Sequence, residues 1–287
     1  MKTPKKLFIA SAILLSCVSC SKNEPELDSS VENTSLSIMS PSDLNLENGL
    51  GATLSPFGPK TKWITEIVDA AVTKNLTNQH NAAAKLFGLG TVNIRFVGGV
   101  GSNNAYSYPG KGVGVIYGEN FMKRVNAFGG YAVAYLAGHE IAHQAQFSEA
   151  TVPSNSHASG IELEADAFSA YFMNKSVTKT WSLAAAGYNF AGTIGGGNHG
   201  TNAQRRAAFA TGWYIATQGT YNIKQLDSQF FYFFKNQVLT GNSSPPTAKK
   251  PSSVDAKLEK FMMSKMDELR KIYSGEISEE EFINLNK

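Results

Sequence analysis

The sequence predicts an α+β fold that is mostly helical, with a small β-sheet ahead of a long helix. Segments 92–97 and 112–117 are rich in β-branched and aromatic residues, which indicates two strands separated by a turn. After them, apolar residues recur with helical spacing from the Gly129-Gly130 pair onward, where a helix can begin. The same spacing predicts three later helices, over 181–191, 202–217 and 223–239.

Composition places most of the chain in one globular domain. Hydrophobic residues make up 42% of the sequence and aromatic residues 11%, enough to fill a substantial core. Helical spacing that begins at Trp63 predicts a first helix over 61–87. The net charge is only +3, and the lysines and arginines are scattered along the chain. We therefore expect no nucleic-acid partner.

The segment His139-Glu140-Ile141-Ala142-His143 carries the strongest chemical signal in the chain. On a helix, side chains four residues apart stack on one face about 5 to 6 Å apart, so the two imidazoles can bind one metal ion. Glu140 lies beside them and can take a proton from a water that zinc activates. The pattern predicts one catalytic Zn²⁺ with Glu140 as general base. Because glycine costs a helix about 1 kcal/mol relative to alanine, Gly138 predicts that another element packs closely there.

A third protein ligand is expected in the next stretch with helical spacing, 161–168. Two neutral histidines and one carboxylate leave a fourth position open for water, as a catalytic zinc site requires. Glu162 lies nineteen positions after His143, which leaves room for a Pro- and Ser-rich turn and a helix that returns beside the first. Glu162 and Asp166 share a face of that helix, whereas Glu164 points the other way. We therefore predict Glu162 as the metal ligand, Asp166 as the acceptor that orients a ligating histidine, and Glu164 as a solvated charge.

These segments resemble motifs of a known class of zinc peptidases. HEIAH followed by ELEAD is similar to the gluzincins, the branch that includes thermolysin, and especially to the CaaX-prenyl-protease and heat-shock-protease family. A third segment, HGTNAQR at 199–205, adds a resemblance to bacterial neutral zinc metallopeptidases with an HExxH, ExxAD and HGTxxQR series. The likeness covers about residues 104–213 and implies a zincin-like domain that hydrolyses peptide bonds. It departs in one respect, because CaaX-type enzymes span the membrane several times and this sequence has no internal span.

The resemblance also implies catalytic roles for His199 and Arg205, which would face the cleft and stabilise the developing oxyanion. The residues alone leave two other interpretations open. His199 could be a turn residue after three glycines, with Thr201 and Gln204 forming a capping box for the next helix. Arg205 could be a structural ion-pair partner near the site.

Residues 1–19 predict an export signal. Three lysines precede an apolar run of thirteen residues, which is shorter than the about 20 that a membrane span needs. The only cysteines of the chain, Cys17 and Cys20, end this run, and each follows a serine. The arrangement resembles a bacterial lipoprotein signal, in which the cysteine after the cleavage site is acylated. We predict Cys20 as the acylated residue, because the sequence after it resembles the surface-export tether of Bacteroidetes lipoproteins; Cys17 is the alternative, because the Leu-Leu-Ser before it is the better acylation motif.

Shifts in composition divide the rest of the chain. Segment 20–58 is rich in Ser, Asn, Glu and Pro with little periodicity, which predicts a flexible tether. Segment 241–253 contains three prolines and predicts a linker. Beyond it, apolar residues of 254–287 fall on one helical face, and Ser278 with Glu281 has the pattern of a capping box. This last segment resembles the short C-terminal (SHOCT) helical hairpin of bacterial proteins, which either packs back on the main domain or docks on a partner.

Together these observations predict a lipid-anchored zinc endopeptidase. Its catalytic domain would span 59–240 and act on a peptide or protein substrate. The protein would be exported and held at the bacterial outer membrane or cell surface by its N-terminal lipid, facing the exterior or the periplasm. The alternative is a non-enzymatic zinc-containing surface lipoprotein that binds a host or envelope protein. Glu140 argues against the alternative, because a structural zinc site has no use for a base.

Overall fold

The structure is a computed structural model whose described residues all belong to one unit, Ser35–Lys287. The predicted signal peptide, Cys17, Cys20 and the tether at 20–58 lie outside the described residues, as does most of the predicted linker. The residues that the structure describes are 61–99, 102–109, 114–149, 158–193, 199–239 and 249–287.

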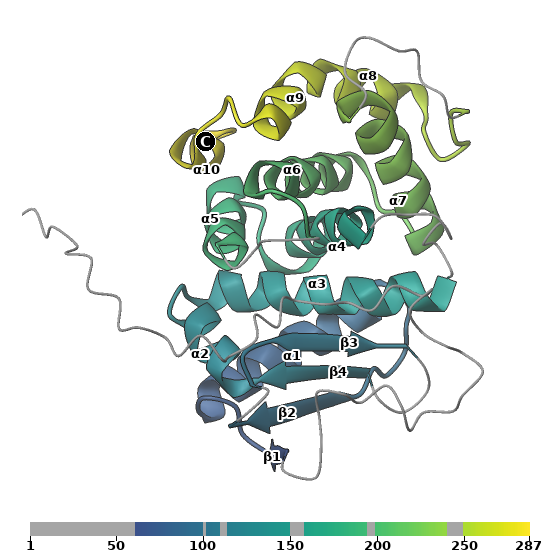
Figure 1. Ribbon diagram of the computed structural model, residues 1–287. Helices are drawn as coiled ribbons and strands as arrows, with labels where there is room; N and C mark the ends of the chain where they lie inside the picture. The colour runs from purple at the N-terminus through teal and green to yellow at the C-terminus, as the bar shows by residue number, and fades with distance from the viewer. Residues whose placement is uncertain (1–60, 100–101, 110–113, 150–157, 194–198, 240–248) are drawn as a thin grey trace, which may run out of the picture. The chain divides into compact units, whose positions relative to one another are not determined.

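Four short strands in the N-terminal half form one mixed sheet (Figure 1). Their order is β1-β2-β4-β3, with β2 and β4 parallel and the two edge strands antiparallel to their neighbours. The two strands that the sequence predicts correspond to β2 and β4. The turn expected between them contains a further strand, β3, at the edge of the sheet. The strand bounds are β1 Lys62–Ile64, β2 Ile94–Gly98, β3 Ala105–Tyr108 and β4 Gly114–Gly118.

Helices make up most of the described chain, so the protein is α+β and mostly helical, as predicted. None of the described helices is both long and apolar enough to cross a membrane. The helices are α1 Ala70–Leu86, α2 Glu119–Asn126, α3 Gly130–Glu149, α4 Ala158–Phe172, α5 Trp181–Gly192, α6 Asn202–Gln218, α7 Ile223–Phe230, α8 Ala256–Ser264, α9 Met266–Ser274 and α10 Glu279–Asn284, with π-helical segments η1 Met173–Val177 and η3 Phe231–Val238.

The first helix begins later than its periodicity predicts. Helical spacing predicts one helix over 61–87, but β1 occupies the start of that segment and α1 begins only at Ala70. Asp69 sets this start, because its carboxylate accepts a hydrogen bond from the Val72 amide at 2.8 Å and caps the helix. Val68, with φ of 65°, turns the chain out of the helical path just before the cap.

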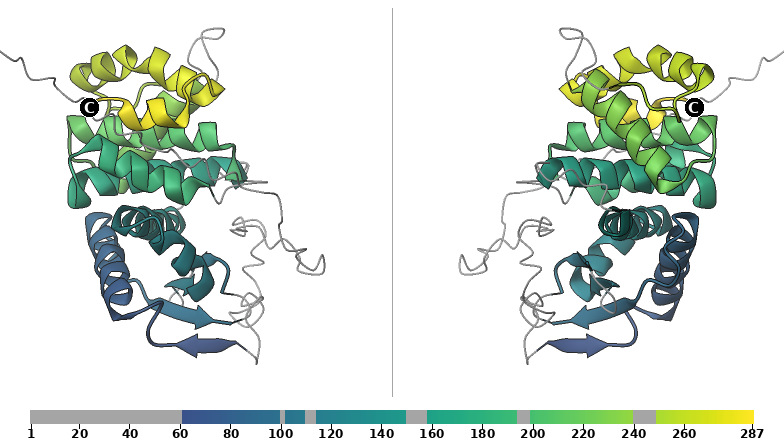
Figure 2. Two further views of the ribbon diagram at one scale, coloured as in Figure 1. Left: turned by 90° about the vertical axis from the view of Figure 1, so that its left-hand side faces the viewer. Right: turned by 90° about the vertical axis from the view of Figure 1, so that its right-hand side faces the viewer.

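Helix α3 lies between the sheet, which α1 and α2 accompany, and helices α4, α5 and α6 (Figures 1 and 2). It contacts α1 and β3, and it also contacts α4 and α5. The close approach predicted at Gly138 is confirmed, because a Cβ there would lie 2.8 Å from Phe172 Cδ1 and from Ser169 Oγ on α4. Gly212 allows a similar approach of α6, where a Cβ would lie 2.0 Å from the carbonyl oxygen of Ala167. Helix α4 is therefore packed tightly between α3 and α6.

The C-terminal helices pack on α5 and α6. The indole of Trp181 donates to the carbonyl oxygen of Phe282 at 3.0 Å, and the ring of Phe282 is buried against Trp181 and Tyr188. The capping box predicted for Ser278 and Glu281 is present at the start of α10. Of the two arrangements open for this hairpin, the structure shows packing on the main domain.

Candidate metal centre

Two histidines of α3 and a glutamate of α4 meet where the two helices pack together. Nε2 of His139 lies 3.1 Å from Nε2 of His143 and 3.2 Å from Oε2 of Glu162. Nε2 of His143 lies 3.7 Å from Oε1 of Glu162. All three side chains are buried, and together they can hold a metal ion.

The separations within this cluster fit the ligand spacing of zinc. Zinc binds nitrogen and oxygen ligands at about 2.0 to 2.2 Å, so neighbouring ligand atoms at a tetrahedral centre lie about 3.3 Å apart. The 3.1 to 3.7 Å separations of the three side chains bracket that value. The cluster therefore has both the donor set and the spacing of a divalent-cation site.

The charges of the cluster also favour a cation. Burial raises the pKa of Glu162, but the neighbouring His139 and His199 outweigh it and hold that pKa well below its usual range. Burial lowers the pKa of His139, yet its hydrogen bonds to Asp166 and Glu162 raise it overall to about 10. Burial lowers the pKa of His143 to about 4. Without metal, His139 therefore carries an additional proton and His143 does not, and a metal ion would bind with release of that proton.

Asp166 accepts a hydrogen bond from Nδ1 of His139 at 3.0 Å, the contact that the sequence predicts for it. Arg205 of α6 binds the same carboxylate from behind, with Nε 2.8 Å from Oδ2 and Nη2 2.9 Å from Oδ1. The Tyr135 hydroxyl donates to Asp166 and accepts from Nη2 of Arg205 at 2.9 Å. Burial raises the pKa of Asp166, but Arg205 and His139 together outweigh burial and lower it. A charged, fully bonded carboxylate thus turns Nε2 of His139 toward the cluster.

Glu164 is buried, which corrects the expectation of a solvated charge. Its Oε2 accepts a hydrogen bond from Nε2 of Gln146 at 2.9 Å, and Oε1 of that glutamine lies 2.7 Å from Nδ1 of His143. Burial and the neighbouring carboxyl of Asp227 raise the pKa of Glu164 well above its usual range. Helix α7 packs on α4, so the face that points away from Glu162 meets protein and not solvent.

Glu140 and His199 bring unpaired polar atoms to the cluster. Glu140 is 2% exposed, and its Oε2 has no hydrogen-bond partner among the described residues. Burial raises the pKa of Glu140 to about 7, and His139 opposes part of that rise. Nδ1 of His199 lies 3.2 Å from Oε2 of Glu162, but its geometry is not that of a hydrogen bond to any described residue. Because buried polar atoms without partners are costly, these two mark a place where a ligand, an ion or water binds.

The 199–205 segment contacts the metal cluster and also caps α6. His199 lies beside Glu162, whereas Thr201 and Gln204 form the capping box at the start of α6. Arg205 makes the buried ion pair with Asp166 that the structural interpretation predicts.

Three contact residues of the site were not predicted from the sequence. Tyr135 and Gln146 lie on the same face of α3 as the two histidines, at successive spacings of four, four and three residues, and this spacing is the signal that identifies them. The third is Ser107 of β3, whose hydroxyl donates to the carbonyl oxygen of Glu140 at 3.0 Å. Gln144 donates to the same hydroxyl at 2.6 Å. Edge strand β3 is therefore fastened along the helix that carries the histidines.

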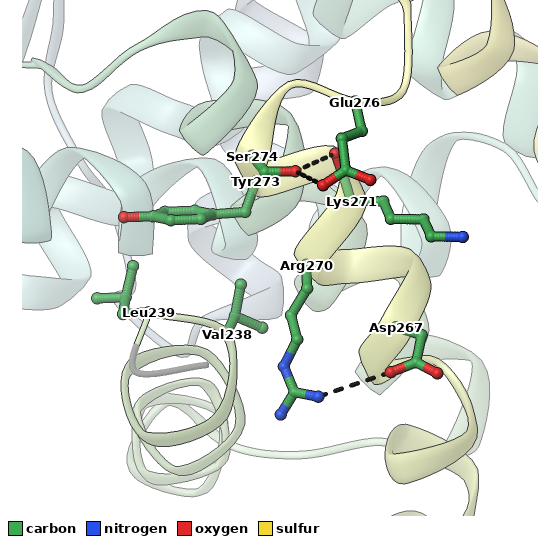
Figure 3. Close-up of a pocket in the computed structure, with 8 residues that line it drawn as sticks. All are labelled: Val238, Leu239, Asp267, Arg270, Lys271, Tyr273, Ser274 and Glu276. Carbon is green, nitrogen blue, oxygen red and sulfur yellow. Dashed lines mark hydrogen bonds and ion pairs between the residues drawn. The ribbon is translucent and has the colours of Figure 1, made fainter. Parts of the chain in front are cut away.

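An open surface hollow of about 490 Å³ lies between the end of η3 and α9 (Figure 3). Arg270 pairs with Asp267 at 3.6 Å, and the Ser274 hydroxyl donates to Glu276 at 2.8 Å, so these polar groups are partnered with one another. None of the metal-cluster residues lines this hollow. The lining residues are Val238, Leu239, Asp267, Arg270, Lys271, Tyr273, Ser274 and Glu276.

In comparisons with protein-family models, with curated proteins and with solved structures, nothing matches this chain.

Proposed function

We propose that this protein is a zinc-dependent endopeptidase with a zincin-like domain, held at the membrane by a lipid on its N-terminal segment. One observation carries the proposal. The buried group of His139, His143 and Glu162 offers three protein ligands, and Glu140, which has an unpartnered carboxylate oxygen, interacts electrostatically with His139 and Glu162. A structural zinc site is closed by four protein ligands, whereas three with a free carboxylate nearby leave a position for water and a base to act on it.

The side chains divide the chemistry of peptide hydrolysis among them. Bound zinc would polarise the scissile carbonyl and lower the pKa of water. Glu140 takes the proton of the attacking water on its free Oε2 and passes it to the leaving amine. His139 and His143 present Nε2 to the site because Asp166 and Gln146 bind their Nδ1 atoms.

His199 and Arg205 take different parts in this proposal. His199 lies beside the cluster, with Nδ1 3.2 Å from Oε2 of Glu162, and we assign it the oxyanion-stabilising role that the family resemblance implies. Arg205 gives Nε and Nη2 to Asp166 and to Tyr135. These contacts favour a positioning role behind His139 over a direct contact with substrate, which changes the role that the resemblance implies for Arg205.

Edge strand β3 supports a peptide as the substrate. It pairs with β4 on one side, and its other edge has no partner strand in the described sheet. Ser107 fixes β3 to the backbone of Glu140. An extended peptide that added to β3 would therefore run beside the general base.

Metal analysis combined with a broad peptide-library digest tests the proposal. We expect one zinc ion per chain and cleavage at internal peptide bonds, lost on chelation and restored by added zinc. Bound zinc without cleavage of any library member would instead favour the non-enzymatic zinc-containing lipoprotein.

A further inference from the structure

Gln146 is a buried glutamine one helical turn beyond His143, and it contacts both helices of the metal cluster. Its Oε1 lies 2.7 Å from Nδ1 of His143. Its Nε2 lies 2.9 Å from the carbonyl oxygen of Ile161 and 2.9 Å from Oε2 of Glu164, both on α4. All four hydrogen-bonding groups in this set lie inside the protein, so their partners are fixed by the fold.

The carbonyl of Ile161 settles the orientation of the Gln146 amide. A carbonyl oxygen can only accept a hydrogen bond, so the amide atom that faces Ile161 is the NH₂ group. The amide oxygen of Gln146 then faces His143, and because it too can only accept, Nδ1 of His143 carries a hydrogen. In the neutral ring, Nε2 of His143 is the nitrogen with a lone pair, and it is the atom that faces His139 and Glu162.

Gln146 also bonds to α4 on both sides of the third ligand. Ile161 directly precedes Glu162, and Glu164 follows it by two residues. The corresponding contact of His139 is different, because Asp166 is a charged group whose own partner, Arg205, lies on α6. The two histidines are therefore held by independent groups, and only the group behind His143 connects α3 to the backbone next to Glu162.

We propose that Gln146 is a positioning residue of the metal centre, which holds His143 with its hydrogen on Nδ1 and holds the Glu162 segment of α4 against that histidine. The proposal deepens the proposed function and rests on the metal cluster of that function. Loss of such an outer contact lowers metal affinity by about 10- to 100-fold.

The test compares Gln146→Met with Gln144→Met in the full chain. Methionine keeps the length and flexibility of glutamine but removes the amide. Gln144 is a matched control, because it lies two residues earlier on the same helix and also loses partly buried hydrogen bonds, to Ser107 at 2.6 Å and to a β3 carbonyl at 2.9 Å, without touching a ligand. Competition with a chromophoric chelator measures Zn²⁺ affinity. We expect a loss of about 10- to 100-fold in Gln146→Met and wild-type affinity in Gln144→Met.

Nitrogen-15 NMR of the His143 ring in the metal-free variants gives a readout that a merely structural role would not move. We expect hydrogen on Nδ1 in wild type and in Gln144→Met, and loss of this preference in Gln146→Met. An unchanged tautomer and unchanged zinc affinity in Gln146→Met, or an equal loss of affinity in both variants, would overturn the proposal. Zinc binding by wild type without peptide cleavage would overturn only the proposed function, whereas absence of zinc binding by wild type would overturn both.

Discussion

Replacing Arg205 by alanine tests whether this residue positions Asp166 or stabilises the oxyanion. In the structure, its guanidinium contacts Asp166 and Tyr135. Its guanidinium donates three hydrogen bonds, two to Asp166 and one to Tyr135. The ion pair is buried, with Arg205 4% and Asp166 0% exposed. Removing one partner of a buried ion pair leaves an uncompensated charge and costs about 3 to 5 kcal/mol. At about 1.4 kcal/mol per factor of ten, the unfolding constant should rise by about two to four orders of magnitude.

Urea denaturation of the metal-free variants measures this cost. The double variant Arg205→Ala/Asp166→Asn removes the stranded charge, so it should recover much of the stability that Arg205→Ala loses. In the single variant, Asp166 loses the two hydrogen bonds that fix its position behind His139, and zinc affinity should fall by about 10- to 100-fold. With zinc at saturation, we expect the turnover number of the folded enzyme to remain near that of wild type.

An opposite pattern would refute the positioning role of Arg205. A donor that acts only in the transition state lowers turnover by about 10²- to 10³-fold without changing the folded state. Such a loss at saturating zinc, with an unchanged free energy of unfolding, would return Arg205 to the oxyanion role.

Three further perturbations test other parts of the structure. His199→Ala should keep zinc and lose about 10²- to 10³-fold in kcat with little change in KM, whereas a lower melting temperature with normal turnover would make His199 a turn residue. Burial raises the pKa of Glu164, so its contribution to stability is present below about pH 4.5 and is lost as the pH rises toward the raised value. Denaturation should therefore show Glu164→Gln equal to wild type near pH 4 and more stable near pH 8, and equal stability at both would contradict the burial argument. Cys20→Ala should abolish lipid labelling and release the protein from the membrane fraction. Labelling that is lost only in Cys17→Ala would show that Cys17 is the acylated residue.

The parts of the site that the sequence predicts are those set by helical periodicity. The i, i+4 spacing of His139 and His143 places both rings on one face of α3, and the same spacing places Glu162 and Asp166 on one face of α4. Gly138 predicts the close approach of these two helices, because the missing side chain is where Phe172 and Ser169 lie. Local rules are sufficient here, because each residue is positioned by its own helix and by one helix–helix contact.

The parts that the sequence misses depend on contacts between elements that are distant along the chain. Glu164 occupies the face of α4 that periodicity assigns to solvent, and the packing of α7 together with Gln146 of α3 makes that face interior. The hydroxyl of Ser107 reaches Glu140 because β3 is an edge strand beside α3, an arrangement set by sheet order. The predicted first helix begins too early because helical periodicity gives no sign of a cap. Asp69 caps the start of α1, several residues after β1 has ended.

Peptide cleavage by Glu140→Gln at full zinc occupancy tests the central claim most directly. Glu140 is not one of the three ligand side chains, and glutamine keeps its size while removing the base. We predict zinc stoichiometry equal to that of wild type together with loss of cleavage, whereas the control His139→Ala should lose both zinc and cleavage. Cleavage that persists in zinc-loaded Glu140→Gln would contradict the role of Glu140 and with it the proposed mechanism.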